Sequence, residues 1–259
     1  PVGLVNNGFG TSVSLSGDTL VAGAPFQATG VLSDTGAAYV FQFAGTWTEV
    51  TSLLGCDTRH QDRFGTSVAT QGDVVLVGSP LYDPGGAVGL NSGAAYVFRL
   101  SSGDFSTFGF GDGTATACPC GNASAAGRHE GCLNSTGFGA KLGPWGTDSL
   151  AADDLKFLAC NLRPSAPALL FAGSNALNGG QGVVFGDGLR LAGGAVRRLG
   201  TLFSNAQGEA QWGPGIGTSA GFAPGQTWHF QVWYRDPPPG SVCGAGFNLS
   251  HGLSVTYSP

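Results

Sequence analysis

The hexapeptide GAAYVF at residues 36–41 returns letter for letter at residues 93–98. Three shorter stretches return in the same order: FGTSV at 9–13 as 64–68, GD at 17–18 as 72–73, and GAP at 23–25 as GSP at 78–80. The offset is 55 residues for these stretches and 57 residues for the hexapeptide. Several matches at nearly one offset indicate a duplicated structural unit.

Each copy of the unit reads as a series of short β-strands. Strand-length apolar or alternating stretches surround Gly17-Asp18, a pair that is typical of a hairpin turn. The first copy predicts four strands, at residues 11–16, 19–24, 37–43 and 46–53. In the second copy the fourth strand is short, because only residues 105–108 remain for it after the polar segment 101–104.

The composition also indicates an all-β protein. Glycine occupies 46 of 259 positions, and glycine costs about 1 kcal/mol at an interior helical position, so a helical bundle is excluded. A hydrophobic content of 42% with 17 Phe and 5 Trp excludes disorder. A net charge of −5 with only two lysines gives no basic surface for nucleic acid, and no apolar run is long enough to span a membrane.

The repeated motifs resemble FG-GAP repeats, which form the blades of integrin-type β-propellers and occur in many secreted bacterial proteins. Phe-Gly, Gly-Ala-Pro and Gly-Ala-Ala-Tyr-Val-Phe carry this resemblance over about residues 6–100, with units at 6–55 and 61–100 in a domain of residues 1–103. Calcium-binding blades of the family carry several Asp residues in one loop. The corresponding loops here hold only Asp34 and Asp83, so calcium binding has little support and no cofactor is expected.

Two blades leave the predicted propeller incomplete. A propeller closes with about four to eight blades, and a repeat buries its faces against its neighbours. The C-terminal domain, further blades or another copy of the molecule must therefore cover the free faces and strand edges. The apolar residues Val2, Leu4 and Val5 are candidates for assembly, as a strand added to an edge, also in a neighbouring molecule.

Residues 104–259 are expected to form a second domain, a disulfide-bearing β-sandwich. Short predicted strands separated by Gly and Pro support a sandwich, at residues 155–161, 168–172, 182–185, 195–201, 210–213, 227–234 and 253–257. Residues 149–156 suggest a helical turn. The order CPCGN, GCLNS, FGDGLR, WYRDP, FNLS resembles an uncharacterised C-terminal module of large secreted bacterial proteins.

Six cysteines, an even number, favour disulfides over a zinc site and thus an oxidising, extracytoplasmic location. They are Cys56, Cys118, Cys120, Cys132, Cys160 and Cys243. Fifteen pairings are open, although Cys118 and Cys120 are not expected to pair with each other. The resemblance places a cysteine at the positions of Gly109 and Leu191, which implies that a bonded pair is replaced here as a unit; a bridge between Cys160 and Cys243 is then our expectation.

No catalytic constellation emerges from the candidate reactive residues. Ser219 sits in a G-x-S-x-G pattern, but within a glycine-rich turn of an all-β chain. Asp153-Asp154 and Asp187 could supply a pair of catalytic carboxylates. Adjacent aspartates more simply stand in solvent at a helix start, where the helix dipole stabilises their charge. The four histidines (His60, His129, His229 and His251) lack metal-site spacing.

The sequence therefore predicts a secreted, non-enzymatic, structural or adhesive protein that associates with copies of itself in a fibre or surface assembly, its signal peptide already removed. Nucleic acid and membrane are not expected partners. The alternative is a carbohydrate-binding or enzyme-accessory module that binds surface glycans through exposed aromatic rings. Such a module requires Trp212, Trp228 and Trp233 on one face of the sandwich, whereas packing in the core is the simpler role for these rings.

Overall fold

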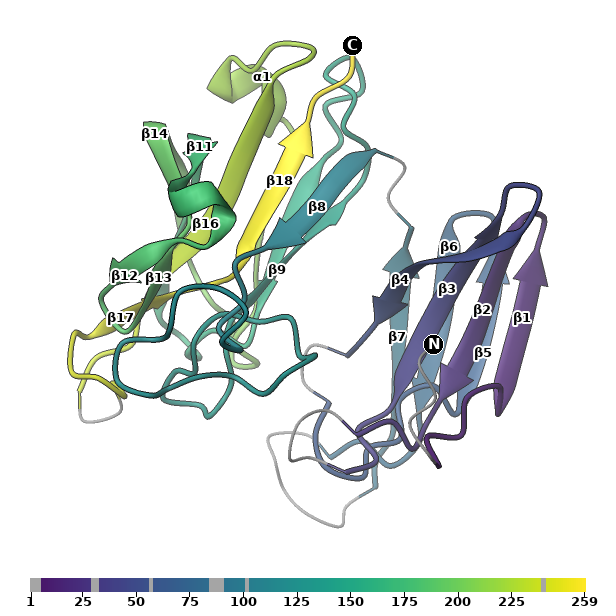
Figure 1. The fold of residues 1–259 in the computed structure, drawn as a ribbon. Helices are drawn as coiled ribbons and strands as arrows, with labels where there is room; N and C mark the ends of the chain where they lie inside the picture. The colour runs from purple at the N-terminus through teal and green to yellow at the C-terminus, as the bar shows by residue number, and fades with distance from the viewer. Residues whose placement is uncertain (1–5, 29–32, 56–57, 84–90, 101–102, 239–240) are drawn as a thin grey trace. The chain divides into compact units, whose positions relative to one another are not determined.

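The computed structural model describes residues 6–28, 33–55, 58–83, 91–100, 103–238 and 241–259. The chain divides into two compact units, Pro1–Leu100 and Ser101–Pro259. Antiparallel sheets dominate both units, which confirms the predicted all-β class (Figure 1).

The first repeat forms a four-stranded antiparallel sheet, as predicted. Its order is β1-β2-β3-β4, and its strands are β1 (Ser12–Ser16), β2 (Thr19–Ala24), β3 (Ala37–Phe43) and β4 (Trp47–Leu53). The β1–β2 hairpin turns at Gly17, whose φ of 56° is readily adopted by glycine. Gly72 repeats this geometry in the second hairpin with a φ of 57°.

The second repeat forms a sheet of three strands within the described residues. Its order is β5-β6-β7, with β5 (Ser67–Gln71), β6 (Val74–Ser79) and β7 (Ala94–Arg99). The prediction of a fourth strand at residues 105–108 was wrong. These residues belong to β8 (Asp104–Phe108), which pairs with a C-terminal strand from Asp104 opposite Thr256 to Phe108 opposite Gly252. Phe105 also packs on the C-terminal core, and this long-range burial outweighs the local order of the repeat.

A six-stranded antiparallel sheet forms one layer of the C-terminal unit. Its path is β14-β11-β16-β18-β8, and a short strand, β17, also pairs with β16. The remaining bounds are β11 (Pro167–Ala176), β14 (Ala192–Phe203), β16 (Thr227–Arg235), β17 (Phe247–Leu249) and β18 (Gly252–Thr256). Trp228, Phe230, Val232 and Tyr234 alternate along β16 and enter the core from one face.

A three-stranded sheet covers this core from the other side, so the unit is a β-sandwich. It has the order β15-β10-β9, with β9 (Lys141–Trp145), β10 (Lys156–Cys160) and β15 (Ala210–Trp212). Phe157 of β10 stacks on Phe230 of β16 at 4.4 Å between ring centroids, which joins the two layers. A separate hairpin pairs β12 (Val183–Phe185) with β13 (Gly188–Arg190).

The predicted helical turn at residues 149–156 is present as a single turn. The Asp153 amide donates to the Ser149 carbonyl at 2.9 Å, and the Ala152 amide donates to Ser149 Oγ at 3.2 Å. The turn does not continue into a helix, because Asp153 adopts a φ of 42° and β10 begins at Lys156. The described residues also contain η2 (Leu177–Gly180), whose backbone is left-handed at Asn178 and Gly179, and the helix α1 (Ile216–Ala220). Among the described residues, no helix is long and apolar enough to cross a bilayer.

His251 is a neutral histidine built into the C-terminal unit. Its Nε2 accepts a hydrogen bond from the Leu142 amide at 3.2 Å, and its Nδ1 donates to the Gly252 carbonyl at 3.0 Å. Burial, together with the charges of Lys141 and His129, lowers the pKa of His251 to about 4, although the hydrogen bond to the Gly252 carbonyl opposes this shift. The ring thus accepts a proton in the unfolded chain near pH 6.5 but in the folded unit only near pH 4.

We expect this difference to remove about 3 kcal/mol of stability between pH 7 and pH 4. The loss begins as the pH falls below the unfolded pKa and is complete below the folded one. Urea unfolding of wild type and His251→Gln at both pH values, followed by tryptophan fluorescence, measures it. The variant keeps an acceptor for the Leu142 amide and should lose about 3 kcal/mol less than wild type on acidification; equal losses would contradict the assignment to His251.

Candidate functional site

The two repeat sheets pack on each other through faces of different kinds. We call the face that carries Phe9 or Phe64 the front face of each sheet and the opposite face its back face. The front face of the second sheet lies on the back face of the first. Phe64 is fully buried in this interface and makes edge contacts with Tyr96 and Phe98 at 5.1 and 5.8 Å between ring centroids. The buried side chains shared by the two sheets are Val21, Ala38, Val40, Phe64, Val75 and Val77.

Hydrogen bonds between three serine hydroxyls of β1 and the backbone of the second repeat fix the register of this internal interface. The Ser12 hydroxyl donates to the Gly65 carbonyl at 2.9 Å. The Thr70 amide donates to Ser14 Oγ at 3.0 Å, and the Gly72 amide donates to Ser16 Oγ at 3.1 Å. Alternate residues of β1 thus bind the backbone of β5 and of the residues that flank it.

The backbones of the two repeats approach each other closely at Gly36. Gly36 pairs in parallel with Phe64, and a Cβ atom at Gly36 would lie 1.9 Å from the Phe64 carbonyl oxygen. Since Gly36 also has a φ of 84°, only glycine fits there. The repeated Gly-Ala-Ala-Tyr-Val-Phe therefore begins with the residue that allows two repeats to pack.

The front face of the first sheet is exposed and apolar. Val13 and Leu15 are 65% and 62% exposed, and Phe9, at 42%, packs its ring edge-on against Tyr39 and Phe41. The strand register places Val13 beside Ala22 and Tyr39, and Leu15 beside Leu20 and Phe41. These side chains form one continuous apolar face.

The back face of the second sheet is the other exposed surface of the repeat pair. Leu76 of β6 and Val97 of β7 lie directly opposite each other and are 45% and 60% exposed. Ser67 and Ala69 of β5 complete this face on its exposed side. The unit thus presents one exposed front face and one exposed back face.

Two sets of residues singled out in the sequence remain: the predicted assembly residues and the aspartates of the two loops where related blades bind calcium. Val2, Leu4 and Val5, like Cys56, lie outside the described residues. Asp34 accepts the Arg63 amide through its backbone carbonyl at 3.0 Å, and Asp83 Oδ1 accepts the Asn91 amide at 2.6 Å. Within the part of the chain that the structure describes, no three His, Cys, Asp or Glu side chains are grouped to hold a metal ion.

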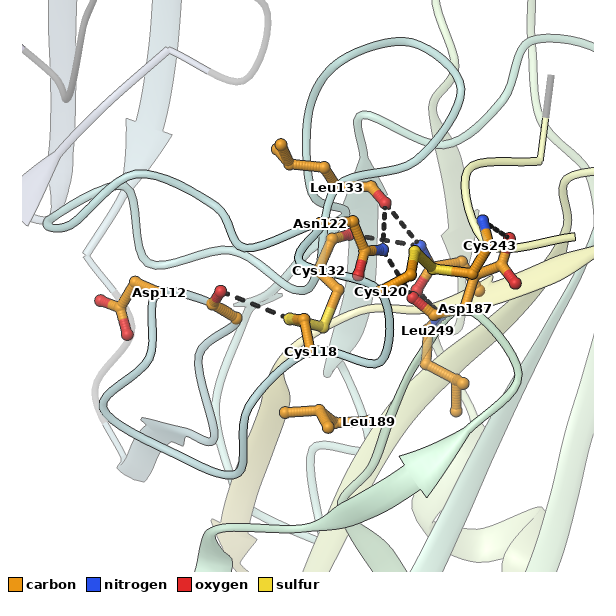
Figure 2. Close-up of a disulfide and its surroundings, with 12 residues drawn as sticks. Asp112, Cys118, Cys120, Asn122, Cys132, Leu133, Asp187, Leu189, Cys243 and Leu249 are labelled. Atoms are coloured by element: carbon orange, nitrogen blue, oxygen red, sulfur yellow. Dashed lines mark hydrogen bonds between the residues drawn. A yellow bond between two sulfur atoms is a disulfide. The ribbon is translucent and has the colours of Figure 1, made fainter. Parts of the chain in front are cut away.

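Disulfides anchor the long loops of the C-terminal unit (Figure 2). Cys118 bonds to Cys132, and Cys120 bonds to Cys243 across 123 residues of sequence. The expected bridge between Cys160 and Cys243 was wrong, because Cys243 belongs to Cys120; Cys160 is disulfide-bonded as well. Cys118 and Cys120 do not pair with each other, in line with the prediction.

Asp187 holds the loop that carries Cys243 (Figure 2). Its buried carboxylate accepts a hydrogen bond from the Cys243 amide at 3.2 Å. It also accepts from the Ala245 amide at 2.8 Å and from the Ser241 hydroxyl. The Asn122 side chain donates to the Asp187 and Leu133 carbonyls at 2.8 Å each. Asp187 therefore stabilises a loop and is not one of a pair of acidic groups.

Gly109 and Leu191, the positions at which the resemblance places cysteines, are neighbours in space. A Cβ atom on Gly109 would lie 2.2 Å from Leu191 Cδ2 and 2.9 Å from Leu191 Cγ. A cysteine sulfur at position 191 would occupy about the place of that Cγ atom, within reach of a second sulfur. Positions 109 and 191 thus have a spacing that suits a disulfide, although they hold a glycine and a leucine.

We expect the double variant Gly109→Cys/Leu191→Cys to close a third bridge within the C-terminal unit on oxidation. Intact mass and non-reduced peptide mapping detect the bond, and the single variant Leu191→Cys, which should retain one free thiol, is the control. A cysteine at position 109 must adopt the left-handed backbone of Gly109, with a φ of 67°. We expect this to cost about 1 kcal/mol of stability but not to prevent formation of the disulfide. Two free thiols in the oxidised double variant would contradict this arrangement.

The aromatic platform for sugar binding does not form as predicted. Trp212 and Trp228 are 4% and 6% exposed and belong to the sandwich core. Their indole nitrogens donate to the Gly200 carbonyl at 2.9 Å and to Gln226 Oε1 at 3.1 Å. Trp233 packs beside Phe247 on the other face of β16. Packing explains these rings, and the three do not share a surface.

The other candidate reactive residues form hydrogen bonds with backbone groups of turns and loops. The Ser219 hydroxyl donates to the Ile216 carbonyl at 3.2 Å inside α1, not at a strand-to-helix elbow. Asp153 accepts the Gly217 and Thr218 amides at 2.9 and 3.0 Å, and Asp154 accepts the Thr147 amide at 2.9 Å. The two aspartates thus bind different backbone segments.

Sequence reasoning missed the two sheet faces as specific surfaces. The repeat makes Val21 equivalent to Leu76 and Val40 equivalent to Val97, so these residues lie on the same face of their sheets. Only the packing of the two sheets shows that the first residue of each pair is buried and the second exposed.

Comparison with known proteins agrees with the repeat. A family model of the FG-GAP repeat matches residues 2–41 and 47–98. No curated protein matches the chain in a sequence search. The resemblance of the C-terminal unit to modules of secreted bacterial proteins lies outside the matched residues and stays a prediction. The N-terminal unit is therefore similar to FG-GAP repeats over nearly its whole length.

Proposed function

We propose that this protein is a secreted, non-enzymatic structural or adhesive component that associates with copies of itself. One observation carries the proposal: the repeat pair leaves apolar side chains exposed on both of its outer faces, including Val13, Leu15 and Val97 at 60–65% exposure. Exposed apolar faces on a soluble domain mark interaction sites. The chain has few charges to oppose such association, since charged residues make up 10% of it.

The C-terminal unit supports an extracellular location. Two disulfides and the buried Asp187 fasten its long loops, and disulfides persist in oxidising surroundings. FG-GAP repeats support the same location and an adhesive or scaffolding role. Structural roles for Ser219, Asp153, Asp154 and Asp187 favour a non-enzymatic protein.

Sedimentation velocity of the purified chain over a hundredfold range of concentration tests the proposal, together with negative-stain microscopy of the same samples and of natural material. We expect the average mass to rise with concentration and elongated or ring-shaped assemblies to appear. Material that stays at the monomer mass of 26.1 kDa throughout, with no assemblies in the natural sample, would overturn self-association.

A further inference from the structure

We propose that the exposed front face of the first sheet docks on the exposed back face of the second sheet in another copy of the chain. This inference rests on the proposed self-association and names the surfaces that carry it. The contact would repeat, between molecules, the interface that the two repeats already form within one molecule.

The exposed front face resembles the buried front face at most positions, although Leu15 is equivalent to Thr70. Phe9 is equivalent to Phe64, and the exposed fractions are 42% and 0%. Leu20 and Ala22 are equivalent to Val75 and Val77, which are buried in the internal interface. The aromatic pair Tyr39 and Phe41 likewise returns unchanged as Tyr96 and Phe98. The first sheet therefore offers the same kind of surface that the second sheet uses to bind.

The exposed back face has the composition of the buried back face. Val21 and Val40 are fully buried under the second sheet, whereas their equivalents Leu76 and Val97 are 45% and 60% exposed. Ser12, which donates to the Gly65 carbonyl, is equivalent to the exposed Ser67. A neighbouring molecule would present the equivalent carbonyl, that of Gly10, to this hydroxyl.

The backbone permits the same approach. Gly36 lets the Phe64 backbone come close in the internal interface, and Gly93 stands at the equivalent position of the second repeat with a φ of 74°. Phe9 of a neighbour would take the place of Phe64 beside it. Apolar side chains, the serine equivalent to Ser12 and the close-contact glycine thus recur on the exposed faces, whereas Ala69 and Gln71 replace Ser14 and Ser16.

The symmetry of the assembly follows from this contact. A front face binds a back face, so the contact is head-to-tail and each open assembly keeps one free front face at one end and one free back face at the other. Repetition gives an open filament, or a ring where the rotation between molecules closes. A second copy fits these faces better than an unrelated partner does, because each exposed surface corresponds in sequence and register to one half of an interface that already exists.

Two variants that block one face each provide the test. Val13→Asp blocks the front face and Val97→Asp blocks the back face; each would bury an unpaired carboxylate in the contact and weaken it by at least about 100-fold. Val183→Asp, at a residue 45% exposed in the C-terminal unit, is the matched control and should assemble like wild type. Because both blocked positions are exposed, the variants should fold, which thermal unfolding verifies.

Mixing distinguishes head-to-tail docking from other contacts. Each blocked variant alone should sediment as a monomer, and an equimolar mixture should form a one-to-one dimer and nothing longer, since only one compatible pair of faces remains. Wild type and control that assemble, with both blocked variants assembling equally well, would overturn the docking faces but leave self-association standing. A wild type that does not assemble would overturn the proposed function itself.

Discussion

The double variant Cys120→Ala/Cys243→Ala is expected to lose about 5 kcal/mol of unfolding free energy in the C-terminal unit. The bridge closes a loop of 123 residues, and the entropy that such a bond removes from the unfolded chain grows with loop length. Urea unfolding followed by tryptophan fluorescence reports on this unit, because Trp212 and Trp228 lie in its core. The free energy in water comes from extrapolation of each curve.

The second bridge of the same unit is the control. Cys118 and Cys132 are separated by 14 residues, so Cys118→Ala/Cys132→Ala should cost about 3 kcal/mol. The long-range bridge is thus expected to contribute about 2 kcal/mol more than the short one. A larger loss for the short bridge would show that loop length does not determine the contribution of these bonds.

Phe64→Ala is expected to destabilise the N-terminal unit by about 3–5 kcal/mol. Its ring is fully buried between the two repeat sheets and contacts Tyr96 and Phe98, so alanine leaves a cavity in the internal interface. Hydrogen exchange detected by mass spectrometry reports this loss as faster exchange of the amides of β5 and β6.

Phe9→Ala removes the same side chain at the equivalent position of the first repeat. Since Phe9 is 42% exposed, we expect a change in stability of less than about 1 kcal/mol, but weaker self-association. The pair of variants therefore separates folding from assembly at two residues with the same local sequence. A large destabilisation by Phe9→Ala, or unchanged assembly, would contradict the division into one internal and one external contact.

The sequence predicts the N-terminal unit well because its signals are local. Alternation, the Gly17-Asp18 turn and the repeat place β1, β2, β3 and β4 to within a residue. The repeat failed at its end, where the half-buried Phe105 packs against the C-terminal core instead of continuing the second sheet. Tertiary burial decides such a segment, and neither alternation nor repeat order contains that information.

In the C-terminal unit, long-range contacts limited the prediction. All seven expected strands are present, but β9, β13 and β17 were missed. In β9, Gly143 and Pro144 interrupt the alternation. The pairing of Cys120 with Cys243 depends on which loops meet, and cysteine spacing does not encode it. Trp212 and Trp228 were open to core or surface roles, and only the sandwich shows that both rings point inward.

The most direct measurement of head-to-tail docking is a disulfide crosslink between molecules. In the internal interface Ser14 Oγ accepts the Thr70 amide at 3.0 Å; the equivalent residues for a contact between copies are Ala69 and Leu15. These two residues lie on opposite outer faces of the repeat pair and cannot meet within one molecule. On oxidation the variant Leu15→Cys/Ala69→Cys should give a ladder of covalent multimers on non-reducing gels, whereas each single variant should yield no more than dimers. A double variant that stays monomeric after oxidation, with both thiols free, would contradict the docking of one sheet face on the other.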